Sequence, residues 1–170
     1  MYKSELNLVR DFVQLLRGGV GPWGPVCVAC EFRYDRGRTD VLALCEKGDH
    51  LIAVEAKLHK WRDALDQAYR NTCFVHSSYV LMPKYVALRL SKHSTDFEHR
   101  NVGLCYIDGG KISIALPAER MAPPELWLLE EARKVVGEGR DAHRWPRRRC
   151  PQDMPEASHA ICRHRRRRNL

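Results

Sequence analysis

The spacing of hydrophobic residues changes several times along the chain, and the first stretch has the period of a helix. Apolar side chains recur every three or four positions from Leu6 to Leu16, as expected for one face of an amphipathic helix. Ser4 precedes this stripe in the manner of an N-cap, and the pair Gly18-Gly19 follows it. We therefore expect a helix at the start of the chain, with Glu5 in its first turn.

Three strand-like runs follow this helix. The first covers residues 26–34, and the next two, residues 39–44 and 50–57, are rich in β-branched and aliphatic side chains. The turn Glu46-Lys47-Gly48-Asp49 between the last two contains the glycine that a hairpin needs. These two runs are therefore expected to form adjacent antiparallel strands.

The rest of the chain alternates between helical spacing and strand-like runs. Residues 60–74 have a helical stripe, and residues 78–82 read as a buried strand that Pro83 ends. Later elements are expected as a helix at 84–90, a hairpin of 102–107 and 111–115 around Asp108-Gly109-Gly110, and a helix at 125–136 that Gly137 ends. This order of helices and strands predicts an α/β fold.

Charged residues interrupt the second and third strand-like runs. Asp40 lies near the start of one run, and Glu55 and Lys57 lie two positions apart in the other. Because side chains alternate along a strand, Glu55 and Lys57 should share one face, while Val54 and Ala56 point to the other. Ionised groups in a core-forming strand need a paired charge or a metal, since their desolvation costs several kcal/mol. The alternative is a solvated strand face.

A hairpin in register would bring two of these acids together. Asp40 and Glu55 could then converge on one hard cation such as magnesium, which prefers carboxylate oxygens. Lys57 beside them could orient an attacking water or neutralise charge that develops on a phosphate. The combination suits hydrolysis of a phosphodiester.

The ordered set of residues resembles the PD-(D/E)xK phosphodiesterases, which include restriction enzymes, Holliday-junction resolvases and recombination exonucleases. The resemblance covers about residues 5–83. Thr39 stands where the family often has a proline before the aspartate. The positions that match are Glu5 on the first helix, Asp40 on the second strand, Glu55-Ala56-Lys57 on the third strand and Gln67 on the helix that follows.

The resemblance implies a restriction-endonuclease-like core with the order α-β-β-β-α-β. Its mixed sheet would be flanked by helices, and the hairpin and the last helix would be additions. The activity implied is that of a metal-dependent DNA nuclease that is structure-dependent or weakly specific for sequence. A non-catalytic nucleic-acid-binding or assembly protein on the same fold is the alternative, and the family leaves open a homodimer.

The resemblance also implies roles for single residues. Asp40 and Glu55, with the Ala56 carbonyl and Glu5, would hold one or two Mg²⁺ or Mn²⁺ ions, and Lys57 would position or activate the water. Gln67 would help to hold the lysine, the acid or the substrate backbone. From the residues alone, Glu5 can equally be an acid that favours a helix start, and Gln67 a polar helix surface. Glu31, in the first strand, is a reserve ligand.

Charge divides the chain near residue 137. Residues 1–137 carry 19 Lys and Arg against 17 Asp and Glu, whereas residues 138–170 carry 10 against 4. We expect one nuclease-like domain over 1–137 and a disordered basic tail over 138–170. Such a tail would bind DNA phosphates, although a solvated tail or an address signal has the same composition. Its candidate DNA-binding residues are Arg147, Arg148, Arg149, Arg165, Arg166, Arg167 and Arg168.

Seven cysteines give no disulfide framework, because their number is odd. Cys27 and Cys30 have C-x-x-C spacing, but a strand would place them on opposite faces. A small zinc site in the tail, with Cys150 and Cys162, stays open. No apolar run approaches the ~18 residues of a membrane span, and the first residues enter a helix rather than a signal peptide, so we expect no membrane partner and a cytoplasmic location.

Overall fold

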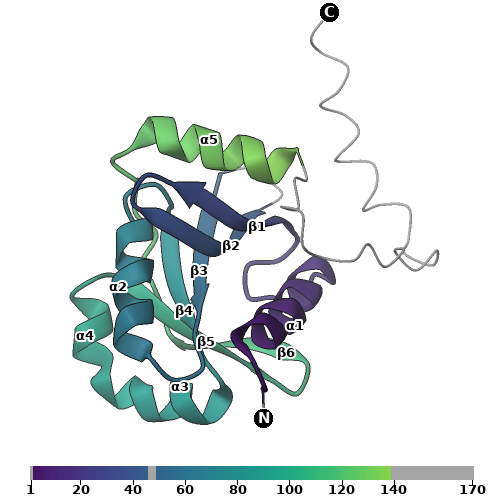
Figure 1. Cartoon of the computed structure of the whole chain (residues 1–170), viewed down its shortest axis with the longest axis vertical. Helices are drawn as coiled ribbons and strands as arrows, with labels where there is room; N and C mark the ends of the chain where they lie inside the picture. Colours follow the sequence, from purple (N-terminus) through teal and green to yellow (C-terminus); the bar gives the residue numbers. More distant parts are fainter. Residues whose placement is uncertain (1, 46–48, 139–170) are drawn as a thin grey trace, which may run out of the picture.

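The centre of the fold is a six-stranded mixed sheet, seen in a computed structural model that describes residues 2–45 and 49–138 (Figure 1). The strands lie in the sheet in the same order as in the chain. The strands are β1 (Val26–Tyr34), β2 (Gly37–Cys45), β3 (Leu51–Ala56), β4 (Ser77–Leu81), β5 (Val102–Asp108) and β6 (Lys111–Leu116). The helices are α1 (Glu5–Arg17), α2 (Trp61–Asn71), α3 (Lys84–Leu90), the 3-10 helix η1 (Ser91–His93), α4 (Ser94–Glu98) and α5 (Leu126–Gly137).

Strand pairing follows from the connections. β1, β2 and β3 pair antiparallel, as do β5 and β6, and the expected antiparallel pairing of β2 with β3 is confirmed. β4 pairs parallel with both β3 and β5, because α2 and the α3–η1–α4 segment carry the chain back before each new strand. The proposed hairpin turn at residues 46–48 lies outside the described residues.

Helices cover both faces of the sheet. On one face, α1 buries Leu8, Phe12 and Leu16 against Val41 of β2 and Val54 of β3. On the other face, α5 packs over β1 and β2, and α2 packs over β3 and β4 (Figure 1). Both faces of β3 and β4 are therefore buried, which explains their nearly continuous apolar sequence.

The helices and strands lie close to their predicted positions, but not every residue predicted to be buried is buried. Ser4 caps α1 by accepting a hydrogen bond from the Asn7 N–H, as expected. Leu6, the first apolar residue of the stripe expected in α1, was wrongly assigned to the buried face, since it is 56% exposed. Residues 91–98 form η1 and α4, which the sequence pattern did not predict, and Phe97 anchors them in the core.

A glycine in β5 provides a test of the packing between β4 and β6. A Cβ atom at Gly103 would overlap the Tyr79 ring and would lie 2.9 Å from the Leu116 carbonyl oxygen. Gly103→Ala should therefore lower the free energy of unfolding by about 1–3 kcal/mol in a urea titration, as overpacked core positions do. Gly137→Ala is the matched control, because a Cβ there meets no heavy atom within 4 Å. Equal stability of the two variants would contradict this description of the core.

Candidate active site

Two carboxylates, Asp40 of β2 and Glu55 of β3, lie where these strands stop pairing. The ladder runs from Leu44 opposite Leu51 to Val41 opposite Val54, and Asp40 and Glu55 would form the next pair. Instead, Asp40 Oδ2 accepts a hydrogen bond of 3.0 Å from the Ala56 N–H. The Asp40 side chain therefore replaces a backbone acceptor and is held at the end of the β2–β3 ladder.

The strand on the other side of β2, β1, is irregular at the position opposite Asp40. Glu31, across from Asp40 in the β1–β2 register, has a φ of 57°, in the left-handed region. Cys30 packs in the core under α1, whereas Phe32 packs under α5 on the opposite face, so the usual alternation is broken at Glu31. Irregularities of this kind redirect side chains and are common next to active sites.

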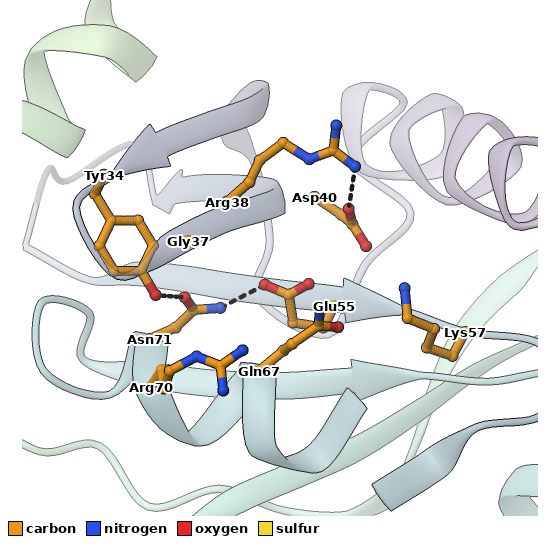
Figure 2. Close-up of a pocket in the computed structure, with 9 residues that line it drawn as sticks. All are labelled: Tyr34, Gly37, Arg38, Asp40, Glu55, Lys57, Gln67, Arg70 and Asn71. Carbon is orange, nitrogen blue, oxygen red and sulfur yellow. Dashed lines mark hydrogen bonds and ion pairs between the residues drawn. The ribbon is translucent and has the colours of Figure 1, made fainter. Parts of the chain in front are cut away.

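A cavity of about 120 Å³ lies next to the carboxylates (Figure 2). Its volume corresponds to about four water molecules, which suits a hydrated ion better than a nucleotide. All four residues expected to be catalytic line it, together with five others. The lining residues are Tyr34, Gly37, Arg38, Asp40, Glu55, Lys57, Gln67, Arg70 and Asn71.

Burial disfavours the charged form of both carboxylates. It raises the pKa of Glu55 to about 8, to which the charge of Asp40 and a hydrogen bond between the two carboxyl groups also contribute. Burial likewise raises the pKa of Asp40, against the effects of the Ala56 N–H, Lys57 and Arg38. The neighbouring cations therefore do not offset the burial of the pair, whereas a divalent cation between the two acids would.

Lys57 lies on the opposite side of the pair from α2. Its Nζ atom donates a 3.2 Å hydrogen bond to Glu5 Oε2 of α1, while Glu55 bonds to Asn71 of α2. Glu55 and Lys57 both line the cavity, but their partners come from helices on opposite faces of the sheet, and Lys57 lies one residue beyond the end of β3. Glu5 pairs with Lys57 and does not line the cavity itself.

The Ala56 carbonyl has the orientation that a cavity ligand needs. The Lys57 N–H donates to the Leu81 carbonyl of β4. In a trans peptide the carbonyl points away from the N–H of the same unit, so the Ala56 oxygen faces β2 and Asp40.

Gln67 contributes a buried oxygen. Its Oε1 atom is inaccessible to solvent and has no hydrogen-bond partner among the described residues, and its side chain lines the cavity. Within residues 2–45 and 49–138, no group of three His, Cys, Asp or Glu side chains could hold a metal. The oxygen donors that fit a hard cation here are two carboxylates, with a carbonyl and an amide.

Two arginines line the cavity from different elements. Arg38 of β2 lies 3.9 Å from Asp40 Oδ1 and 3.6 Å from Glu31 Oε1, so Glu31, the reserve ligand, pairs with an arginine at the site. Arg70 of α2 is exposed, and its guanidinium forms no hydrogen bond or ion pair with the described residues. With Lys57, three cations thus surround two acids.

Sequence reasoning missed the residues that hold Glu55. Glu55 Oε1 accepts a 2.7 Å hydrogen bond from Asn71 Nδ2, and Asn71 Oδ1 accepts one of 2.7 Å from the Tyr34 hydroxyl (Figure 2). Asn71 Oδ1 also accepts a 2.9 Å hydrogen bond from Thr39 Oγ1. Helical spacing could have indicated Asn71, because this residue lies one turn after Gln67 and shares its face of α2.

Several predictions fall elsewhere. The arginines proposed to bind DNA, at 147–149 and 165–168, and the zinc alternative in the tail lie outside the described residues. Cys27 and Cys30 pack on opposite faces of the sheet, as expected. None of the helices that the structure describes has the length and apolarity needed to span a bilayer.

Comparison with known proteins supports the fold alone. No protein-family model matches this chain, and no curated protein matches it. A similar solved structure is that of SPO1766, a protein of unknown function from Silicibacter pomeroyi, with 17% sequence identity and a TM-score of 0.51. The match covers 78% of this chain and 80% of that one, so it extends over most of the α/β domain.

The raised pKa of Glu55 predicts a pH dependence of stability. Because the folded-state pKa of about 8 exceeds the ordinary 4.5, the protonated group stabilises the fold fully below pH 4.5, and this contribution is lost as the pH rises through 8. In EDTA, the free energy of unfolding should fall from pH 5 to 9, and Glu55→Gln should lose much less. Urea titrations across this range measure both slopes. Parallel curves for the two proteins would contradict the prediction, and Glu98→Gln on α4 serves as an exposed control.

Proposed function

We propose that this chain is a metal-dependent deoxyribonuclease of the PD-(D/E)xK type, built on a restriction-endonuclease-like core. The observation that carries the proposal is the placement of Asp40, Glu55 and Lys57 around one cavity at the end of the β2–β3 ladder. Asp40 lies 15 positions before Glu55 in the chain, and the pairing of β2 with β3 brings the two carboxylates to one cavity.

The cation would be Mg²⁺ or Mn²⁺, held by Asp40, Glu55 and the Ala56 carbonyl. When bound, such an ion lowers the pKa of a coordinated water and offsets negative charge on a phosphate. Gln67 adds a buried oxygen without a partner among the described residues, which can bind the ion or its water. Glu5 acts indirectly in this scheme, because its carboxylate pairs with Lys57.

Lys57 would hold and orient the attacking water. Its side chain is only 21% exposed, and its contact with Glu5 keeps the ammonium next to the cavity. Arg38 and Arg70 reach the same cavity from β2 and α2, so their charges can bind the phosphates on either side of the scissile bond. The substrate proposed is therefore a DNA backbone, and the basic composition of residues 138–170 would add affinity that falls with salt.

A second candidate is a non-catalytic nucleic-acid-binding or assembly protein on the same fold. The observation that favours it is the small set of acidic groups, because among the described residues only two carboxylates line the cavity. In this case, the arginines and Lys57 would bind phosphate, and no bond would be cleaved.

Cleavage assays test the leading proposal. The full chain should cut DNA in Mg²⁺ or Mn²⁺ and not in EDTA, and Lys57→Ala should reduce the rate at least 100-fold while DNA binding changes little, since the lysine would act on the water. Supercoiled, linear, single-stranded and four-way-junction DNA should be compared. Lys60→Ala, an exposed lysine outside the cavity, is the matched control. Equal loss of binding and cleavage in Lys57→Ala would argue against this role.

Calorimetry with Mn²⁺ separates the two candidates. Wild-type protein should bind the ion, and Asp40→Asn should abolish binding, because one of two ligand carboxylates becomes a neutral amide. Circular dichroism should confirm that the variant is folded. DNA binding without any affinity for Mn²⁺ would favour the non-catalytic candidate.

A further inference from the structure

A chain of polar side chains lies behind Glu55 and away from the cations of the cavity. Thr39, Glu55 and Asn71 are at most 1% exposed, although they come from β2, β3 and α2. Buried polar groups without partners are costly, so a network in which every contact is made restricts how its members can turn. Three hydrogen bonds of 2.7–2.9 Å join Tyr34, Thr39 and Glu55 to the one amide of Asn71.

The chemistry of the donors sets the direction of this network. In the cation-bound state of the proposed function Glu55 is ionised, and an ionised carboxylate accepts hydrogen bonds and donates none, so the atom of Asn71 that faces it is the nitrogen. The amide oxygen then faces Tyr34 and Thr39, and both hydroxyls donate to it. Burial raises the pKa of Tyr34 to about 12, which keeps this donor protonated.

The hydrogen bond from Asn71 makes the two carboxylate oxygens of Glu55 inequivalent. Oε1 accepts the hydrogen bond from Asn71 (Figure 2). The carboxyl group also interacts with Asp40 at the cavity. Without the amide, Oε1 would be a buried acceptor with two hydroxyls nearby, and the side chain could rotate toward Tyr34 and Thr39. The carboxylate would then leave the position beside Asp40.

We propose that Asn71 is a positioning residue that holds the Glu55 carboxylate toward the cavity for a divalent cation, with Tyr34 and Thr39 fixing the orientation of the Asn71 amide. This inference rests on the proposed function, because it assigns the cation to Asp40 and Glu55. Residues that orient metal ligands in this way commonly change metal affinity by 10- to 100-fold.

Mn²⁺ affinity measures the effect directly, by the electron paramagnetic resonance signal of the free ion in a titration. Asn71→Leu keeps a similar volume and removes the donor, so the apparent Kd for Mn²⁺ should rise about 10- to 100-fold. Thr39→Val should raise it about fivefold, as expected for one lost hydrogen bond. Thr39→Ser retains the hydroxyl and should restore the wild-type Kd.

A double variant distinguishes positioning from loss of packing. If Tyr34 acts only through Asn71, Tyr34→Phe should weaken Mn²⁺ binding in the wild type and have no further effect in Asn71→Leu. Ser78→Ala is the control, because this hydroxyl in β4 is also fully buried but has no partner among the described residues. It should leave the Kd unchanged.

The outcomes distinguish failure of the proposed function from failure of the positioning role of Asn71. If wild-type protein binds no Mn²⁺, the proposed function fails and this inference fails with it. If the wild type binds Mn²⁺ and folded Asn71→Leu binds it equally well, only the positioning role is overturned. If Asn71→Leu does not fold, equal Kd values for Thr39→Val and wild type would overturn that role.

Discussion

The hydrogen bond from the Ala56 N–H to Asp40 Oδ2 is the contact on which the arrangement of the site depends. It ends the β2–β3 ladder without leaving the donor unsatisfied, so the two strands can separate inside a buried sheet at little cost. The same bond fixes one carboxylate at the edge of the cavity. Because Lys57 bonds to β4 on its other side, the Ala56 carbonyl is left facing the space between the strands.

The charges around this space explain why the fold can keep two acids there. Arg38, Arg70 and Lys57 reach the cavity from three elements, and none of them lies between the carboxylates closely enough to prevent their pKa values from rising. A fold that only needed to bury these positions would do so more cheaply with neutral side chains. The arrangement of acids at the centre and cations at the rim is complementary to a cation bound to an anionic backbone.

The sequence predicted much of the fold, because helix and strand positions depend on local periodicity. Strand spacing located Asp40 and Glu55 in neighbouring strands, whereas Gln67 was expected beside them only from the family resemblance. It could not predict Asn71 bonding to Glu55, since the contact depends on how α2 crosses the sheet. Nor could it predict the left-handed Glu31, which reverses the alternation of β1. Leu6 was placed wrongly because apolar spacing at the first turn of a helix does not show which side faces solvent.

The energetic cost of Glu55 is itself an argument about its role. The residue is 1% exposed, burial and Asp40 oppose its ionisation, and its bonded partner is a neutral amide rather than a cation. A glutamine at this position would form hydrogen bonds without the charge, so a purely structural role does not require a carboxylate. What a carboxylate adds is affinity for a hard cation, because ion binding repays the cost of its desolvation. On the proposed function, the buried acid, the amide behind it and the end of the β2–β3 ladder beside it are parts of one cation-binding site.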